Sequence, residues 1–282
     1  MGETIPTWSD FVLAFDLFRD AILCGAVVGA VLGYLGVFIV LRRMVFVTAA
    51  ITQSAGLGVA LGMYVGILSG SESSPVLWAI GVSLLAAAAV AYDPSRLRIS
   101  RESVLAVVWL AGSCGAVLLG DRIAQEAHDI SAILFGTAVL VRPEDLWLTA
   151  GVGGVALIAV AWARRALVLA GYDPDGARVQ GVPVRLLELL FLALVTLEVS
   201  VATRAIGALP VFAFSVLPGM AALMAIPRLS GAFPAALLGG ITAAVGGYMA
   251  AFFLSFPVGA CQAAAALTLV LVALPIRWLR SG

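Results

Sequence analysis

The sequence of 282 residues contains no lysine and only one histidine. The P-loop of nucleotide-hydrolysing enzymes needs a Gly-Lys-Ser/Thr segment to hold phosphates, so this chain cannot form one. Its three cysteines, Cys24, Cys114 and Cys261, stand alone in apolar segments, without the CxxC or Cys/His spacing of a metal or redox site. We therefore expect a chain that is not an enzyme and carries no cofactor.

Charge is scarce as well, because charged residues make up 11% of the sequence and hydrophobic residues 62%. Soluble domains are usually about a quarter charged, and the mean hydropathy here is +1.11. One soluble core could not bury this much apolar surface, so lipid must surround most of it. The formal net charge of zero argues against a nucleic-acid partner. The expected fold class is an all-α, polytopic integral membrane protein.

Apolar stretches of membrane-spanning length recur along the chain, since a helix needs about 20 residues to cross the hydrocarbon core. A further stretch, Ile130 to Val141, is too short to span and is expected to be re-entrant or interfacial. We expect one transmembrane domain over residues 1–282. The nine expected spans are 17–41, 45–69, 75–92, 103–120, 145–163, 186–203, 207–226, 232–254 and 258–276.

Arginine distribution predicts the orientation of these spans. If the spans alternate across the membrane, twelve arginines fall on one side and four on the other. The arginine-rich side is then cytoplasmic, with the N-terminus outside and the C-terminus inside. The pattern is weakest at 204–231, where Pro210, Pro218 and Pro227 interrupt it.

Two series of glycines repeat every four residues, which is just over one helical turn. Each series therefore forms a flat strip that another helix backbone can approach closely. Ordinary tight packing explains such strips, and a moving, pathway-lining surface is the alternative. The series are Gly25, Gly29 and Gly33 in the first span and Gly58, Gly62, Gly66 and Gly70 in the second.

The largest expected cytoplasmic loop runs from Arg164 to Arg185. Within it, Asp173 is a good helix N-cap, Pro174 a good first helical residue and Gly181 a plausible terminator. This pattern predicts a helix of under two turns, which would be unstable alone in water. Such a helix makes sense if it docks into a groove on a partner, although it could also be a plain connector.

Ionisable residues inside a span need a physical explanation. Glu198 lies about two-thirds of the way through its span and could face a polar pathway or pair with Arg204. A second group of polar residues, near the expected outer mouth, could receive a cation or belong to a solvated loop. That group is His128, Asp129, Glu144 and Asp145.

Several short motifs resemble those of the zinc and manganese ABC transporter permeases of the ABC-3 type, in the same order over about residues 20–280. They are Leu41-Arg42-Arg43-Met44, Gly58-Val59-Ala60-Leu61-Gly62, Asp129 to Leu134 with Phe135-Gly136, Ala177 followed by Gly181-Val182-Pro183-Val184, Ile206-Gly207-Ala208-Leu209, Val216-Leu217-Pro218 and Phe256-Pro257-Val258-Gly259.

The resemblance implies a bacterial inner-membrane permease, built like a type II ABC importer and working as a homodimer around a central pathway. It also implies two copies of a cytoplasmic ATPase subunit and an extracytoplasmic solute-binding protein as partners, with lipid around the spans. The loop of 164–185 then resembles the coupling helix that receives the ATPase stroke. The residues assigned to this coupling are Asp173, Asp175, Ala177, Arg178, Gly181 and Val182.

This sequence departs from the family at the metal-binding pair. The family carries an Asp and a His four residues apart on one helix face, and the aligned positions here are Ala49 and Gln53. Gln53 keeps one neutral oxygen, which is a poor ligand for a divalent transition metal. The metal ligands therefore stay unknown, and Thr52, Gln53 and Glu198 are the candidates for the pathway.

Three functions remain open at this point. The first is the permease subunit of an ABC transporter that imports a divalent metal (zinc, manganese or iron) or a metal complex, powered by a separate ATPase. The second is a membrane subunit of the same architecture with a non-metal substrate or a role other than import, suggested by Ala49 and Gln53. The third is a self-sufficient secondary transporter or a membrane enzyme.

Overall fold

The computed structural model describes residues 8–70, 73–92, 100–123 and 141–281, which form helices and no strand. Each of the nine expected spans coincides with one of these helices, so the all-α membrane fold is confirmed. The expected re-entrant stretch at 130–141 lies almost wholly outside the described residues. The helices are α1 (Trp8–Leu41), α2 (Val45–Ser69), α3 (Pro75–Ala91), α4 (Arg101–Arg122), α6 (Pro143–Trp162), α7 (Arg164–Tyr172), α8 (Pro174–Val179), α9 (Val184–Ile206), α10 (Ala208–Ala225), α11 (Leu229–Leu254) and α12 (Val258–Ser281).

Eight of the described helices are long and apolar enough to cross a membrane. The ninth expected span is α3, an apolar helix of 17 residues. At 1.5 Å per residue it is about 25 Å long, slightly less than the roughly 30 Å of a bilayer core. Neighbouring helices α2 and α9 cover part of α3, which lowers the need for a full lipid-facing span.

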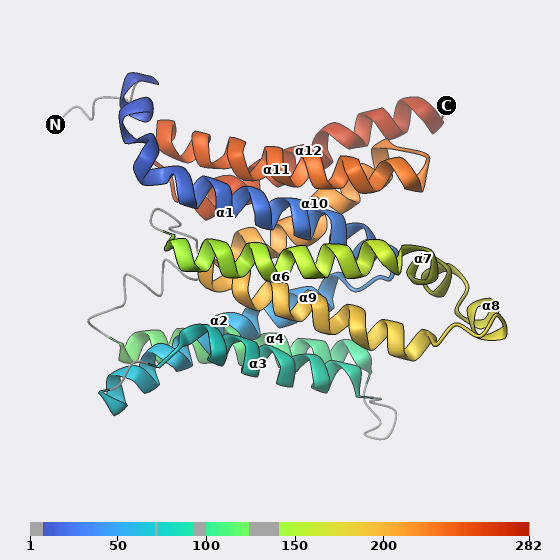
Figure 1. The fold of residues 1–282 in the computed structure, drawn as a ribbon, viewed down its shortest axis with the longest axis horizontal. Coiled ribbons are helices and arrows are strands. Elements are labelled where there is room, and N and C mark those ends of the chain that lie inside the picture. Colours follow the sequence, from blue (N-terminus) through green and yellow to red (C-terminus); the bar gives the residue numbers. More distant parts are fainter. Residues whose placement is uncertain (1–7, 71–72, 93–99, 124–140, 282) are drawn as a thin grey trace.

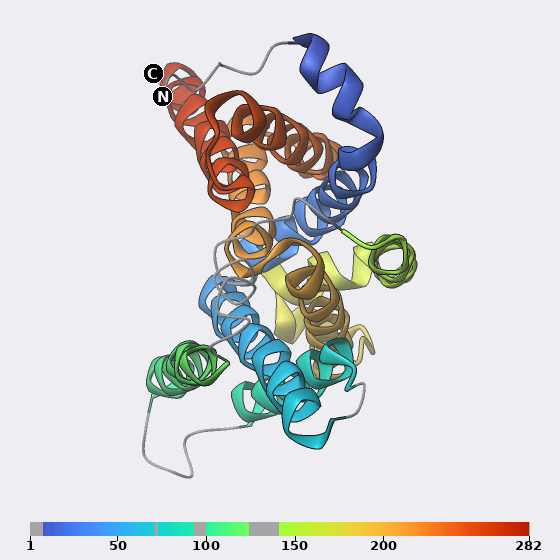
Figure 2. The same cartoon turned by 90° about the vertical axis from the view of Figure 1, so that its left-hand side faces the viewer.

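The long helices run side by side along the longest axis of the molecule (Figure 1). Seen end on in Figure 2, α10 and α11 pack with both α1 and α12, while α2 packs with α3, α4 and α9. Helix α10 also contacts α2 and α9 and so joins the two groups. Helix α6 lies at the periphery against α1 and α9, and most of its surface is exposed, as expected of a helix that faces lipid.

Helix α12 ends at the end of the bundle opposite to the start of α1 (Figure 1). The short helices α7 and α8 lie beyond the end of α6, on the same side as the end of α12. We call this side the α8 end. It gathers the ends of α1, α3, α10 and α12 and the starts of α2, α4, α9 and α11, as the predicted alternation of spans requires.

The glycine strips bring helix backbones into contact. A Cβ atom added at Gly29 of α1 would collide with the carbonyl group of Gly240 on α11. A Cβ at Gly58 of α2 would lie 2.5 Å from the Cα atom of Ala79 on α3, closer than ordinary van der Waals contact. The tight packing predicted from the four-residue spacing is therefore confirmed at Gly29 and Gly58, whereas Gly70, at the end of the second strip, has no atom within 4 Å of an added Cβ.

Prolines disturb the helices less than the sequence pattern predicted. Helix α10 runs unbroken from Ala208 to Ala225 through Pro210 and Pro218. Pro210 falls in the first turn, where its missing N–H has no helical partner, and Pro218 is accommodated because neighbouring helices bury it. Only Pro227 lies between helices, in the turn from α10 to α11. The span expected over 207–226 is therefore one continuous helix, although the pattern there was the weakest.

Candidate functional site

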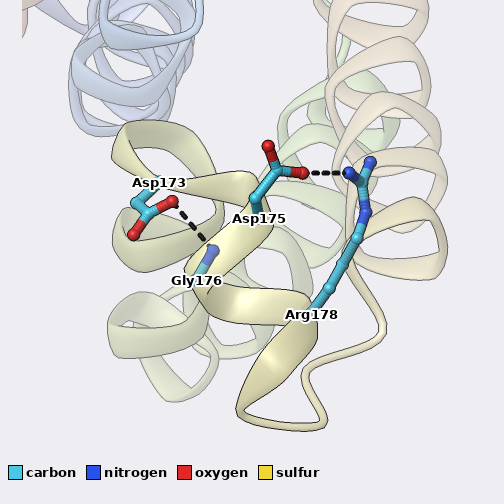
Figure 3. A network of polar contacts seen from close by, with 4 residues as sticks. All are labelled: Asp173, Asp175, Gly176 and Arg178. Atoms are coloured by element: carbon cyan, nitrogen blue, oxygen red, sulfur yellow. Dashed lines mark hydrogen bonds and ion pairs between the residues drawn. The ribbon is translucent and has the colours of Figure 1, made fainter.

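Helix α8 has the start that the sequence predicted. The Asp173 Oδ1 atom accepts a hydrogen bond of 2.8 Å from the backbone N–H of Gly176, and Pro174 is the first helical residue (Figure 3). A Cβ atom at position 176 would collide with the Asp173 carboxylate, so any larger residue there would require this side chain to shift. The cap satisfies a backbone donor that a free helix start would leave without a partner.

The other end of α8 closes in a Schellman turn. Gly181 has φ +78°, a left-handed conformation that glycine adopts without a steric penalty. The N–H of Gly181 donates to the carbonyl of Arg178, and the N–H of Val182 donates to the carbonyl of Ala177, both at 3.0 Å. The predicted terminator is therefore confirmed, and hydrogen bonds fix both ends of this six-residue helix.

Apolar contacts hold α8 against the bundle. Ala177 is completely buried and forms a small cluster with Ala170 of α7 and Val184 of α9. Helix α7 itself was not expected, because residues 164–185 had been interpreted as a loop with one short helix. Its signal is the spacing of Leu167 and Ala170, which are three residues apart and both buried.

The outer face of α8 is exposed. Arg178 and Asp175 form an ion pair of 2.6 Å whose side chains are 63% and 86% exposed (Figure 3). Such a pair contributes at most about 1 kcal/mol to stability. Val179 is 89% exposed and Tyr172 is 66% exposed. An apolar tip beside a charged pair, on a rigid and capped helix, suits contact with another protein.

The family's metal-binding positions lie one turn apart on α2. Ala49 and Gln53 are both partly exposed, and the backbone of Gln53 packs against Gly112 of α4. The Gln53 Oε1 atom is buried without a hydrogen-bond partner. Thr52 is buried, and its hydroxyl donates to the carbonyl of Thr48 on its own helix at 2.7 Å. Among the residues that the structure describes, no group of three or more His, Cys, Asp or Glu side chains could hold a metal ion.

Glu198 of α9 is fully buried, and neither of its carboxylate oxygens has a hydrogen-bond partner. The carboxylate faces α6 and α1, since a Cβ atom at Gly153 would lie 3.2 Å from both Oε atoms and 2.8 Å from Val31 Cγ2. The backbone of Gln53 instead packs against Gly112 of α4, so these two candidate pathway residues have different helices as neighbours.

The expected pairing of Glu198 with Arg204 was wrong. Arg204 lies 3.7 Å from the carboxylate of Asp145, which belongs to the first turn of α6. Residues three or four apart share a helix face, whereas Glu198 and Arg204 are six apart. Of the polar group expected near the outer mouth, Asp145 therefore lies at a helix start and forms an ion pair. His128 and Asp129 of the same group lie outside the described residues.

Known proteins resemble this chain in sequence and in fold. The chain is 27% identical over 238 residues to the manganese transport system membrane protein MntC of Halalkalibacterium halodurans, covering 84% of this chain and 80% of that protein. It is 30% identical over 220 residues to the manganese import system permease protein ScaB of Streptococcus pneumoniae, covering 78% and 76%. The PsaBC structure from Streptococcus pneumoniae in complex with Fab superposes with a TM-score of 0.84 at 24% identity, covering 96% of this chain and 98% of that one.

A family model describes the same region. The model of the ABC 3 transport family matches residues 14–277, which include all the long helices described above and the α7–α8 segment. The match extends over nearly the whole chain. This chain therefore belongs to the ABC 3 transport family.

Proposed function

We propose that this chain is the membrane-spanning permease subunit of an ABC importer for a divalent metal, with manganese as the first candidate. Two copies of the chain form the pathway, two ATPase subunits power it, and an extracytoplasmic solute-binding protein delivers the metal. Family membership supports the permease role, and the names of the manganese relatives support the substrate. Zinc and iron remain within the same substrate class.

We also propose that the protein lies in a bacterial inner membrane with the α8 end in the cytoplasm. Twelve of the sixteen arginines then fall on the cytoplasmic side, as the positive-inside rule requires. The N-terminus is outside, and the C-terminus lies in the cytoplasm, at the same end of the bundle as α7 and α8.

The observation that carries the proposal is the rigid, exposed helix α8. Its two caps and the buried contact of Ala177 would transmit a push on α8 to α7 and α9. The chain has no lysine and cannot form a P-loop, so that push must come from a separate ATPase. Asp173, Gly181 and Val182 hold the shape of α8, and Asp175 and Arg178 present its charged face.

A pair of glycine substitutions tests this docking. Gly181→Trp places a bulky side chain at the C-cap of α8, and Gly70→Trp is the matched control. Both glycines have positive φ, +78° and +60°, and neither has atoms within 4 Å of an added Cβ, but Gly70 lies at the opposite end of the bundle. We expect Gly181→Trp to abolish ATPase co-purification and Gly70→Trp to retain it. Equal ATPase binding by both variants would contradict the docking of the ATPase on α8.

For the metal, we propose a pathway that includes Thr52, Gln53 and Glu198. A dication that leaves water needs compensating charge or strong ligands. Gln53 offers an amide oxygen that has no partner, and Glu198 is the one buried charged residue in the described part of the chain. In this scheme Glu198 of α9 supplies the negative charge. The family's aspartate would supply that charge from α2, where this chain has Ala49.

Uptake of radioactive manganese into proteoliposomes that contain the assembled transporter tests the pathway. We expect Glu198→Ala to lower uptake strongly, and the control Thr196→Ala, also buried on α9, to leave it unchanged. Introducing the family pair with Ala49→Asp and Gln53→His should restore uptake in the Glu198→Ala background. Full uptake by Glu198→Ala alone would contradict the role of Glu198.

A further inference from the structure

A cavity of about 370 Å³ lies at the α8 end, away from α8 itself. Four segments that are far apart in the sequence form it: the turn from α1 to α2, the end of α3, and the starts of α4 and α9. Its polar wall contains Arg42, Arg101 and Arg185, together with Tyr92 and Glu188. The function proposed above assigns no role to this cavity.

Within the described residues, the cavity lining carries more positive than negative charge. Three arginines face a single carboxylate, and the ion pairs found within the described residues involve none of these three. Arg42 is fixed in place, because its Nη2 atom donates to the carbonyl of Leu167 at 3.0 Å and its guanidinium lies 5.4 Å from the ring centroid of Phe191. Its Nε and Nη1 atoms are buried and have no acceptor. Arg42 is therefore a fixed positive charge at the inner wall, while Arg101 and Arg185 are the exposed arginines of this cavity.

Helix starts add to the positive potential. Three lining residues lie at helix starts. Met44 lies at the start of α2, Arg101 at the start of α4 and Arg185 at the start of α9. The first turns of α2 and α9 have no side-chain cap, although the N–H of Val184 at the start of α9 donates to the carbonyl of Val182 at 2.8 Å. Converging helix starts attract anions, and phosphate groups in particular.

The rest of the wall is apolar and continues onto a surface that faces lipid. Val90 and Leu192 line the inside, and Leu189 lines the rim, where it is 46% exposed. Next to this rim, Leu186 and Leu190 of α9 are 54% and 52% exposed. A ligand with a phosphate head and acyl chains fits this combination of surfaces better than a free anion does.

We propose that this cavity, between the α1–α2 turn and the starts of α4 and α9, binds the phosphate headgroup of an anionic phospholipid of the inner leaflet. The phosphate lies among Arg42, Arg101 and Arg185, and the acyl chains follow the exposed leucines of α9. Arginine-lined pockets between transmembrane helices on the cytoplasmic side bind anionic headgroups in this way. The two exposed arginines, Arg101 and Arg185, control the affinity, while Arg42 forms the fixed inner wall.

Lipid binding by the purified full-length chain in neutral detergent tests the proposal. Phosphatidylglycerol and phosphatidylcholine are added at equal concentration, and retained lipid is counted by native mass spectrometry. Each arginine near an anionic headgroup contributes on the order of fivefold in affinity. The double variant Arg101→Gln/Arg185→Gln should therefore lose phosphatidylglycerol binding by about 25-fold. The double variant with lysine at both positions should keep most of it.

Arg228→Gln is the matched control, because Arg228 is exposed at the same end of the bundle but does not line the cavity. It should retain the native affinity, and the native preference for phosphatidylglycerol should weaken at high salt. Equal binding of both lipids by the native chain would overturn the proposal. So would unchanged lipid binding in the glutamine double variant.

Two further measurements separate other ligands from a lipid. Inorganic phosphate added alone should not displace bound phosphatidylglycerol, and full displacement would make this a free-anion site and overturn the lipid assignment. Loss of ATPase co-purification in the glutamine double variant, with its lipid binding intact, would also overturn the assignment, because the cavity would then belong to the protein interface.

Discussion

The environment of Glu198 can be tested through the glycine that it faces. In Gly153→Ala, the new methyl group would lie 2.8 Å from Val31 Cγ2 and 3.2 Å from both Glu198 oxygens. Inserting a methyl group into such a closely packed place costs about 1–3 kcal/mol. The adjacent Gly154 is a matched control on the same helix, because an added Cβ there has no atom within 4 Å.

Both substitutions gain the same intrinsic helix preference of alanine over glycine, about 0.5–1 kcal/mol. The difference between the two variants therefore isolates the contact with α1 and α9. Since 1 kcal/mol shifts the midpoint of unfolding of a large domain by about 2–4 °C, Gly153→Ala should unfold roughly 2–12 °C below Gly154→Ala. The midpoint is measured by heating the protein in detergent and quantifying the remaining folded fraction by size-exclusion chromatography.

A double-mutant cycle then assigns the contact to the carboxylate. Adding Glu198→Ala to Gly153→Ala removes two of the three close atoms, so the pair should show a coupling energy of at least about 0.5 kcal/mol. Equal unfolding midpoints for Gly153→Ala and Gly154→Ala, or no coupling to Glu198, would refute the position of α6 against α9.

Substitutions at three other contacts extend these tests. Gly240→Ala should destabilise the protein by about 1–3 kcal/mol through its collision with α1, whereas Gly246→Ala on the same helix has open space and should not, as thermal unfolding will show. Asp173→Ala removes the cap of α8, worth about 1 kcal/mol, and should weaken ATPase binding more than Asp173→Asn in a pull-down assay. Arg204→Ala and Asp145→Ala should each cost about 1 kcal/mol or less, and the double variant should cost no more than the larger single one in the same unfolding assay.

Local sequence signals predicted the parts of this protein that depend on neighbouring residues. Hydropathy over about 20 residues located the spans, because each span must satisfy its backbone hydrogen bonds within one helix. Asp173, Pro174 and Gly181 located α8 to within a residue at each end, because capping involves atoms only a few positions apart. The ordered motifs were sufficient to identify the family.

Tertiary structure alone decided which helix faces which. Most residues of α9 around Glu198 are buried, so the sequence pattern alone could not show that this carboxylate faces α6 and α1. The partner of Arg204 proved to be Asp145, some sixty positions earlier in the chain. The arginine-lined cavity likewise exists only because four distant segments end at the same level of the bundle. Hydropathy and capping act within one helix, whereas packing joins side chains across the whole chain, and a single sequence does not record those contacts.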